Sequence, residues 1–250
     1  MYTYAVLANL AYTAPQGPDP KQVFESVATD LQIEQAFFAE TSVDAEMYTL
    51  VLPRSVIFLC RGTESMEDVG ADLMVFKTKC QTIPGAKIHR GFAQQYASLA
   101  PAITKQVQRF AEFAEDEMRS VLFIGHSLGG ALATIGAALT KKEFPHLYVE
   151  CVSFGCPRVG NKAFAEFFNA NVDRHQRYVN GNDIVTRVPR INYTHVGNEC
   201  KIGTGVGKSG CVSRYIGTIG DHSMNEYIAA FQTQGGGTEK DRLLDGTSFS

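Results

Sequence analysis

Short apolar runs alternate with longer stretches of helical periodicity along most of the chain. The apolar runs are bounded by turn-forming residues and predict β-strands at 48–52, 56–60, 121–124, 149–154 and 177–179. Apolar residues at helical spacing predict helices at 91–113, 128–140, 162–170 and 224–232. Regular alternation of strands and helices favours an α/β fold, in which helices cover a largely parallel sheet and the first two strands form an antiparallel flank.

The remaining segments predict less regular structure. Residues 1–16 have the pattern of a first helix, and Pro101 is expected to kink or divide the helix at 91–113. The glycine-rich stretch 197–220 predicts loops or a hairpin. The last residues, 234–250, include three successive glycines and are expected to form a loosely held tail.

Length and charge narrow the classes of function. A chain of 250 residues can form one large or two small domains, and it contains no internal repeat, so a single domain over 1–250 is predicted. Lys plus Arg number 23 and Asp plus Glu number 26, and this net charge of −3 argues against a nucleic-acid partner or a polybasic membrane anchor. No apolar run reaches the ~18 residues of a transmembrane helix.

The N-terminus and the cysteines bear on the cellular compartment. The start of the chain lacks the basic residues and long apolar core of a signal peptide, so we expect it to be cytoplasmic if complete and secreted if a leader was removed. The six cysteines lack zinc-ligand spacing and are expected to be reduced, although Cys200 and Cys211 are near enough in sequence for a local disulfide. The sequence has no evident metal-ligand cluster and no dinucleotide fingerprint, and residues 203–209 lack the spacing of a phosphate-binding loop, so we predict neither a metal nor a cofactor.

The segment 121–139 carries the clearest chemical signal. A predicted strand leads into the sequence GHSLG at 125–129, and a predicted helix follows directly. In this context the G-x-S-x-G pattern indicates a nucleophile elbow, a strained turn whose glycines let strand and helix approach each other. The turn presents the serine hydroxyl at the positive end of the helix dipole, which stabilises an anion formed during attack. Ser127 is therefore the predicted nucleophile, and the backbone N–H of Leu128 is a predicted oxyanion donor.

A serine nucleophile needs a histidine base and an acid that orients the histidine, and after this kind of elbow the acid precedes the histidine. Asp183 follows a predicted strand in a loop rich in Asn and Gly, which is the position expected of the acid. Asp173 precedes that strand and Asp221 adjoins a candidate base, so neither is as well placed.

Four histidines follow the elbow in the chain. His146 lies in a connection without a motif, and His175 lies in a charged run that predicts a solvated side chain. His195 and His222 both satisfy the chain order with Asp183 as the acid. The position of His222 at the start of the last predicted helix favours it modestly, and the residues alone leave both histidines open.

Seven short motifs between residues 58 and 222 are informative as an ordered set. They are FLCRGTES (58–65), HRGF (89–92), GHSLGGALA (125–133), SFGCPRVGN (153–161), NGNDIV (180–185), HVGNE (195–199) and DH (221–222). In this order they resemble the class 3 lipases, a fungal-lipase-like family of α/β hydrolases. The resemblance covers most of the chain and implies an α/β-hydrolase fold with a mostly parallel sheet. It implies the triad Ser127, Asp183 and His222, and it leaves His195 and His89 as structural residues.

The same resemblance implies a second oxyanion donor and a lid. In the family the donor is the residue after Arg-Gly, which is Thr63 here, offering its backbone N–H and its hydroxyl. Residues 65–85 correspond to a helical lid, and 65–76 mixes apolar and acidic residues as an amphipathic flap does. Many relatives have a Trp near Val69, whereas this chain has none. The departure leaves two interpretations open: a preference for soluble or short-chain esters, or replacement of the Trp by Val69 or Met74.

We therefore predict a serine ester hydrolase, a lipase or carboxylesterase that forms an acyl-enzyme. The resemblance implies a triacylglycerol, a monoacylglycerol, a phospholipid cleaved at sn-1 or a feruloyl ester as substrate, with a lipid–water interface as one site of action. Two alternatives stay open: a catalytically silent interaction module, and an acyltransferase on the same scaffold. Loss of a triad residue would favour the silent module, and all three residues are present.

Overall fold

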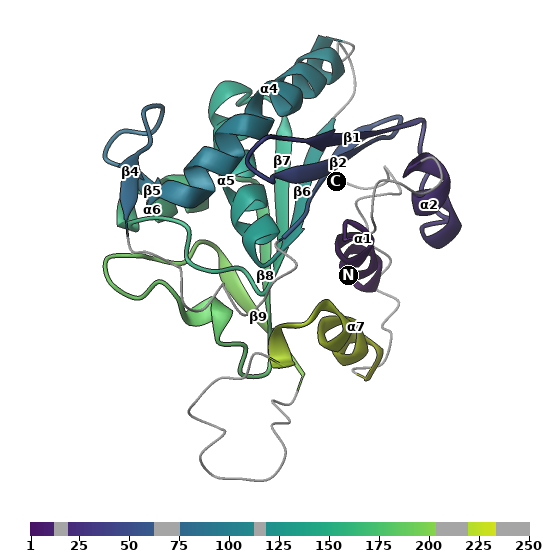
Figure 1. The fold of residues 1–250 in the computed structure, drawn as a ribbon. Helices are drawn as coiled ribbons and strands as arrows, with labels where there is room; N and C mark the ends of the chain where they lie inside the picture. The colour runs from purple at the N-terminus through teal and green to yellow at the C-terminus, as the bar shows by residue number, and fades with distance from the viewer. Residues whose placement is uncertain (13–19, 63–75, 113–118, 204–219, 234–250) are drawn as a thin grey trace, which may run out of the picture.

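A computed structural model describes residues 1–12, 20–62, 76–112, 119–203 and 220–233 of the chain. Within them seven strands form one sheet in the order β1-β2-β3-β6-β7-β8-β9, and two short strands form another (Figure 1). The strands of the large sheet are β1 Gln35–Glu40, β2 Glu46–Val51, β3 Ser55–Cys60, β6 Ser120–His126, β7 Tyr148–Phe154, β8 Arg174–Asn180 and β9 Asn198–Ile202. The short strands are β4 Lys77–Lys79 and β5 Lys87–His89.

The large sheet is antiparallel on one side and parallel over the rest. The pairs β1–β2 and β2–β3 are antiparallel, and β3, β6, β7, β8 and β9 run parallel to one another. All six residues of β3 are buried, as expected of a strand covered on both faces. The arrangement confirms the predicted α/β class and the antiparallel flank.

Helices cover both faces of this sheet (Figure 1). One face packs against α4 Arg90–Glu112, α5 Leu128–Glu143 and α6 Lys162–Asn171, and the other packs against α1 Tyr2–Leu10, α2 Pro20–Val27 and α7 Met224–Thr233. Alternate residues of the strands point into two hydrophobic cores, one on each face of the sheet. Phe58 stacks on Phe123 in the first core, with ring centroids 4.9 Å apart, and Phe154 stacks on Tyr178 in the second, with centroids 5.4 Å apart. None of the described helices is both long enough and apolar enough to cross a bilayer.

The predicted strands and helices are all present, within a few residues at each end, and the helix expected within 1–16 is α1. The elements of the described residues that were not predicted are α2, β1, β9, the two strands of the small sheet, and two short 3₁₀ helices at 185–187 and 220–222. The prediction of loops or a hairpin for 197–220 is wrong at 198–202, where β9 pairs with β8. The sequence of β9 is NECKI, and only Ile202 is buried. An edge strand this polar has no apolar run to mark it. The predicted tail at 234–250 lies outside the described residues.

Pro101 does not divide the helix in which it lies. Helix α4 runs unbroken from Arg90 to Glu112 with Pro101 inside it. A proline removes the hydrogen bond to the carbonyl four residues earlier, which belongs to Ala97. Both Pro101 and Ala97 are exposed, so water is accessible to the freed carbonyl and the helix continues.

The parallel strands end at one common edge of the sheet. The residues that follow them there are Arg61 after β3, Ser127 after β6, Gly155 after β7 and Gly181 after β8. Sites in open α/β sheets form outside the carboxyl ends of the strands. This edge therefore collects the loops that carry the residues singled out above.

Candidate active site

Ser127 occupies a strained turn between β6 and α5. Its φ of 57° and ψ of −126° lie in a region that non-glycine residues rarely adopt, and the side chain is fully buried. A Cβ on Gly125 would lie 2.2 Å from the Gly129 carbonyl oxygen, and one on Gly129 would lie 2.1 Å from the Cys60 carbonyl oxygen. Only glycine fits at either position, so the predicted elbow geometry is confirmed.

The positive end of the α5 helix dipole, at its N-terminus, is not offset by any acidic side chain in its first turn. Ser127 is the N-cap, Leu128 is the first helical residue, and the first turn contains no acidic side chain. The first N–H groups of a helix have no intrahelical acceptor, and together with the dipole they make this end attractive to an anion. An oxyanion formed beside Ser127 would meet these donors.

Asp183 and His222 form a buried pair. The Nδ1 of His222 donates to Oδ2 of Asp183 at 2.7 Å, and both side chains are fully buried. The carboxylate also accepts from the Val185 N–H at 2.9 Å and from the Tyr227 hydroxyl at 2.7 Å. Burial and the adjacent carboxylate raise the pKa of Tyr227 well above its usual value, so its hydroxyl keeps the proton that it donates. Three donors therefore stabilise negative charge on Asp183.

Gly155 connects this pair with the elbow. It has a φ of +58°, and a Cβ there would lie 2.7 Å from His222 Nδ1 and 2.8 Å from Asp183 Oδ2. The preceding residue, Phe154, accepts a hydrogen bond from the N–H of Ser127 at 2.9 Å. The end of β7 thus holds the backbone of the serine and leaves space for the acid–base pair. Sequence reasoning missed this role of Gly155, although the glycine lies in the motif at 153–161.

Two buried atoms at the site have no hydrogen-bond partner among the described residues. They are Oγ of Ser127 and Nε2 of His222. With Nδ1 bound to the carboxylate, the neutral imidazole offers Nε2 as a proton acceptor. A buried polar atom without a partner is costly, and such atoms in native structures call for an explanation such as catalysis. The arrangement can deprotonate a hydroxyl.

The other histidine that fits the chain order, His195, has a different role. Its Nε2 lies 2.6 Å from the carbonyl oxygen of Thr186, so it donates to the backbone rather than facing the elbow. Thr186 in turn donates to the carbonyl of Asp183 at 2.8 Å. Burial and the charge of Arg177 lower the pKa of His195 to about 3. His195 is thus a neutral residue that supports the Asp183 loop, as the resemblance implied.

His89 and His175 are packed side chains. At the start of α4, Nδ1 of His89 accepts from the N–H of Phe92 at 3.4 Å, which confirms the structural role. The prediction of a solvated His175 is wrong, because its ring lies 4.9 Å from that of Phe168 and burial lowers its pKa to about 3. His175 follows the first residue of β8, and strand pairing brings it under α6 despite the charges around it in sequence.

Thr63 and the first part of the expected lid, 65–75, lie outside the described residues. The residue before Thr63 is described: a Cβ on Gly62 would lie 2.7 Å from the carbonyl oxygen of His126, so the chain leading to Thr63 lies against the elbow. The expectation of a helical lid is wrong at 77–79, which form β4 of the small sheet.

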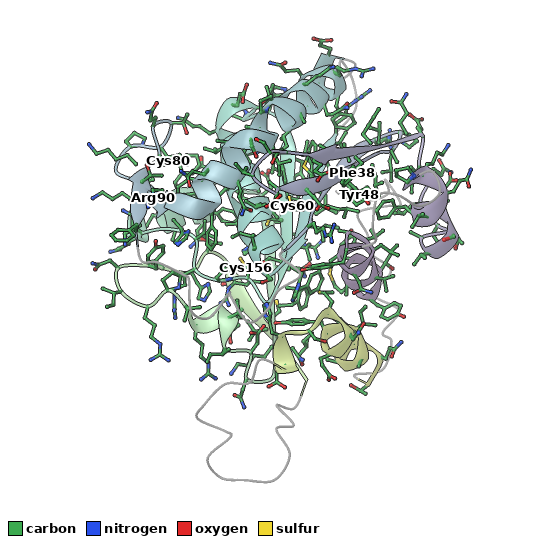
Figure 2. The ribbon with its side chains drawn as sticks, viewed as in Figure 1. Phe38, Tyr48, Cys60, Cys80, Arg90 and Cys156 are labelled. Atoms are coloured by element: carbon green, nitrogen blue, oxygen red, sulfur yellow. The ribbon has the colours of Figure 1, made fainter. Side chains whose placement is uncertain are left out.

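The described cysteines carry free thiols: Cys60, Cys80, Cys151, Cys156 and Cys200. The proposed partner of Cys200, Cys211, lies outside the described residues. Figure 2 shows Cys60 and Cys156 near the centre of the molecule and Cys80 with Arg90 by the small sheet. Burial raises the pKa of Cys60 and of Cys156 to about 12. Both remain protonated and are unsuited to act as nucleophiles in place of the serine.

Comparison with known proteins gives consistent family matches. A family model described as lipase (class 3) matches residues 57–193, more than half of the chain. Secreted mono- and diacylglycerol lipase 1 of Fusarium solani is 30% identical over 163 residues, covering 64% of this chain and 47% of that protein. Phospholipase A1-II 4 of Oryza sativa subsp. japonica is 31% identical over 137 residues, covering 48% of this chain and 35% of that protein. The matched region spans less than half the length of each relative.

Solved structures share the arrangement of sheet and helices. A lipase from Rhizopus microsporus var. chinensis superposes with a TM-score of 0.67 at 28% identity, covering 80% of this chain and 72% of that one. Lipase II from Rhizopus niveus gives a TM-score of 0.70 at 24% identity, covering 88% and 90%.

Proposed function

Because the chain belongs to the class 3 lipase family and has the α/β-hydrolase fold, we propose that it is a serine ester hydrolase acting through an acyl-enzyme. One observation carries the proposal. Ser127 is held strained and buried at the head of α5, and the His222–Asp183 pair is buried against Gly155, next to the residue that binds the serine N–H. Ser127 Oγ and His222 Nε2 have no hydrogen-bond partner among the described residues, so the hydroxyl and the base that acyl transfer needs are both available.

In the first half of the reaction, Ser127 Oγ attacks the ester carbonyl carbon and its proton passes to Nε2 of His222. Asp183 orients the imidazole and stabilises the imidazolium. His222 then gives this proton to the departing alkoxide, and the acyl group remains on Ser127. In the second half a water molecule loses a proton to His222 and attacks the acyl-enzyme, and the carboxylic acid leaves as Ser127 regains its proton.

The negative charge of each tetrahedral intermediate forms beside the N-terminus of α5. We assign the backbone N–H of Leu128 and that of Thr63 as its two donors, the first supported by the helix geometry and the second by the family resemblance. Each such donor contributes on the order of 3 kcal/mol to transition-state stabilisation. The family scaffold and the position of Gly62 against the elbow support the placement of Thr63.

Glycerolipids are the proposed substrates. Relatives are named mono- and diacylglycerol lipases and phospholipases A1, and these names point to acyl esters of glycerol. Two of these names describe secreted enzymes, which favours the secreted alternative for this chain. We further propose that the sheet and its two helical layers form one domain, since the single large sheet connects residues 35 to 202.

Replacement of Ser127 by Ala tests the nucleophile. We expect Ser127→Ala to lose hydrolysis of p-nitrophenyl esters and of a diacylglycerol, with kcat falling by about 10⁶ as in other serine hydrolases. A fluorophosphonate probe should label the original chain, with a Ser127 Oγ–P bond formed and fluoride released, and should not label the variant. Ser26→Ala is the matched control, because Ser26 lies exposed on α2.

Two outcomes would contradict the proposal. Turnover retained by Ser127→Ala would exclude Ser127 as the nucleophile. A folded original chain that neither reacts with the probe nor hydrolyses esters would favour the silent interaction module. Assay of the diacylglycerol below and above its solubility limit separates an esterase from a lipase, whose rate rises once an interface forms.

A further inference from the structure

His126, the residue before the nucleophile, is buried and uses both ring nitrogens in hydrogen bonds. Its Nε2 lies 2.6 Å from the backbone carbonyl oxygen of His222, and its Nδ1 lies 2.7 Å from the hydroxyl of Tyr12. The side chain is buried, and its ring centroid is 4.5 Å from that of His222. None of these contacts belongs to the proton transfer described above.

The two partners fix the direction of both bonds. A carbonyl oxygen only accepts hydrogen bonds, so Nε2 of His126 carries the proton and donates a hydrogen bond to the backbone carbonyl of His222. Nδ1 is then the acceptor, and the Tyr12 hydroxyl donates to it. Burial and the neighbouring His222 lower the pKa of His126 well below its usual value, so the ring stays neutral and only one of its two nitrogens carries a proton. The His222 carbonyl requires this tautomer, and the Tyr12 hydroxyl satisfies the remaining ring nitrogen and fixes the orientation of the ring.

The bond to His222 acts on a backbone that must be placed accurately. His222 ends the short helix η2 Gly220–His222, and the side-chain amide of Asn180 donates to the adjacent carbonyl of Asp221 at 3.0 Å. The His126 side chain is the second anchor, and His126 is the residue directly before Ser127 in the chain. The hydrogen bond therefore fixes the segment of the base relative to the strand that carries the nucleophile.

Tyr12 also contacts the chain that leads to the proposed oxyanion donor. A Cβ on Gly62 would lie 2.4 Å from the Tyr12 hydroxyl oxygen, and the Arg61 guanidinium lies 5.9 Å from the centre of its ring. The hydroxyl thus meets the end of β3 on one side and the His126 ring on the other. Contacts of this one side chain reach both the loop before Thr63 and, through His126, the base.

We propose that Tyr12 and His126 are positioning residues for the active site: the Tyr12 hydroxyl anchors Nδ1 of His126 and so fixes the orientation of its ring, and His126 in its Nε2–H tautomer holds the His222 backbone in register with Ser127. The inference rests on the proposed function, since His222 matters in this way only as the base. It adds Tyr12, which lies just after α1, to the residues on which turnover depends.

Replacement of Tyr12 by Phe removes the hydroxyl and keeps the ring. We expect kcat for p-nitrophenyl esters to fall on the order of tenfold with KM unchanged, because a misplaced catalytic group slows chemistry rather than substrate binding. Tyr2→Phe is the matched control: Tyr2 lies on α1 and its hydroxyl meets only the amide of Gln232 among the bonds described, 3.2 Å away. The control should retain the original kcat, and thermal melting of both variants should show that they are folded.

Imidazole ¹⁵N spectra provide the readout that a loss of packing alone would not produce. In the original chain the His126 ring should show a protonated Nε2 and a hydrogen-bonded, unprotonated Nδ1, a signal assigned to His126 by its loss in His126→Gln. In Tyr12→Phe the Nδ1 resonance should shift toward that of an unprotonated nitrogen without a hydrogen-bond donor. His126→Gln keeps an N–H donor near the position of Nε2, so its kcat should exceed that of His126→Phe, which has none.

The outcomes separate this inference from the proposed function. An active chain in which Tyr12→Phe leaves both kcat and the Nδ1 resonance of His126 unchanged would overturn the inference alone. Equal kcat values for folded His126→Gln and His126→Phe would also overturn it. An original chain without hydrolysis or probe labelling would overturn the proposed function, and the inference with it.

Discussion

Gly155 is the residue whose replacement should most directly displace the acid–base pair. A Cβ at this position would lie within 2.8 Å of both His222 and Asp183. Because both side chains are fully buried, neither has free space into which to move. The steric requirement for glycine is therefore a requirement of the site as well as of the φ of +58°.

We expect Gly155→Ala to lower kcat by about a hundredfold or more, since a displacement of ~1 Å at a catalytic group has effects of this size. Gly85→Ala is a matched control. Gly85 also has a positive φ, +73°, but a Cβ there would meet only Ala163, at 3.7 Å. Backbone strain should cost each variant about 1–2 kcal/mol of unfolding free energy. Gly155→Ala should lose more because of the clash, and it alone should lose activity. Equal kcat values for the two, measured with p-nitrophenyl esters, would contradict the role of Gly155.

Several residues at this scale could not have been found from the sequence. The elbow is a local signal, because glycines and serine are adjacent and lie between a strand and a helix. Tyr12 and Tyr227 carry no such signal. Their hydroxyls bind His126 and Asp183, which lie more than 40 residues away in the chain. Only the folded sheet brings such distant residues within hydrogen-bond distance.

At the scale of elements, prediction succeeded where burial leaves a pattern. Strand β6 has a continuous buried run and was predicted, whereas β9 at the sheet edge has one buried residue and was not. Helix α4 shows the opposite kind of error. Its apolar residues were recognised, but the consequence of Pro101 was overstated because its exposure was unknown.

The exposed position of Pro101 leads to a prediction for helix α4. Replacement by Ala restores a backbone N–H that can bind the Ala97 carbonyl, and it removes a residue unfavourable to helices. We expect Pro101→Ala to raise the free energy of unfolding by about 1–3 kcal/mol, measured by urea denaturation, without changing kcat. Gln108→Ala, at another exposed position of α4, should change it by less than about 0.5 kcal/mol. A destabilised Pro101→Ala would show that the proline relieves strain elsewhere in the helix.

At the scale of the whole molecule, the site depends on both ends of the described chain. Tyr12 follows α1 and His222 precedes α7, and these two helices lie in the same core cluster on one face of the sheet (Figure 1). The Gln232 amide also donates to the Tyr2 hydroxyl at 3.2 Å. The class of fold follows from alternating patterns in the sequence. The contact between α1 and α7, by contrast, forms only in the packed molecule and leaves no pattern in the sequence.

Glu150 links the stability of the molecule to pH. It lies on β7 with 1% of its surface exposed, and among the described residues neither carboxylate oxygen has a hydrogen-bond partner. Arg174 on β8 has its Nη1 3.9 Å from the carboxylate, and the charged groups Asp173 and Arg174 flank the site beside Tyr148. Burial raises the pKa of Glu150 from 4.5 to about 8, because the interior disfavours the charged form.

The raised pKa means that the folded chain binds this proton more tightly than the unfolded chain does. Its contribution to stability is therefore complete below pH 4.5 and is lost as the pH rises through about 8. Glu150→Gln cannot ionise, so its free energy of unfolding should fall less between pH 5 and pH 9 than that of the original chain. The difference should amount to a few kcal/mol, at about 1.4 kcal/mol for each unit of pKa shift.

Denaturation by urea at several pH values measures this difference. Glu166→Gln serves as the control, because Glu166 is exposed on α6 in an i,i+4 pair with Lys162. Its pH profile should run parallel to that of the original chain. If the Glu150→Gln profile also ran parallel, Glu150 would be ionised in the folded state at neutral pH, and the charge would have to be stabilised by Arg174.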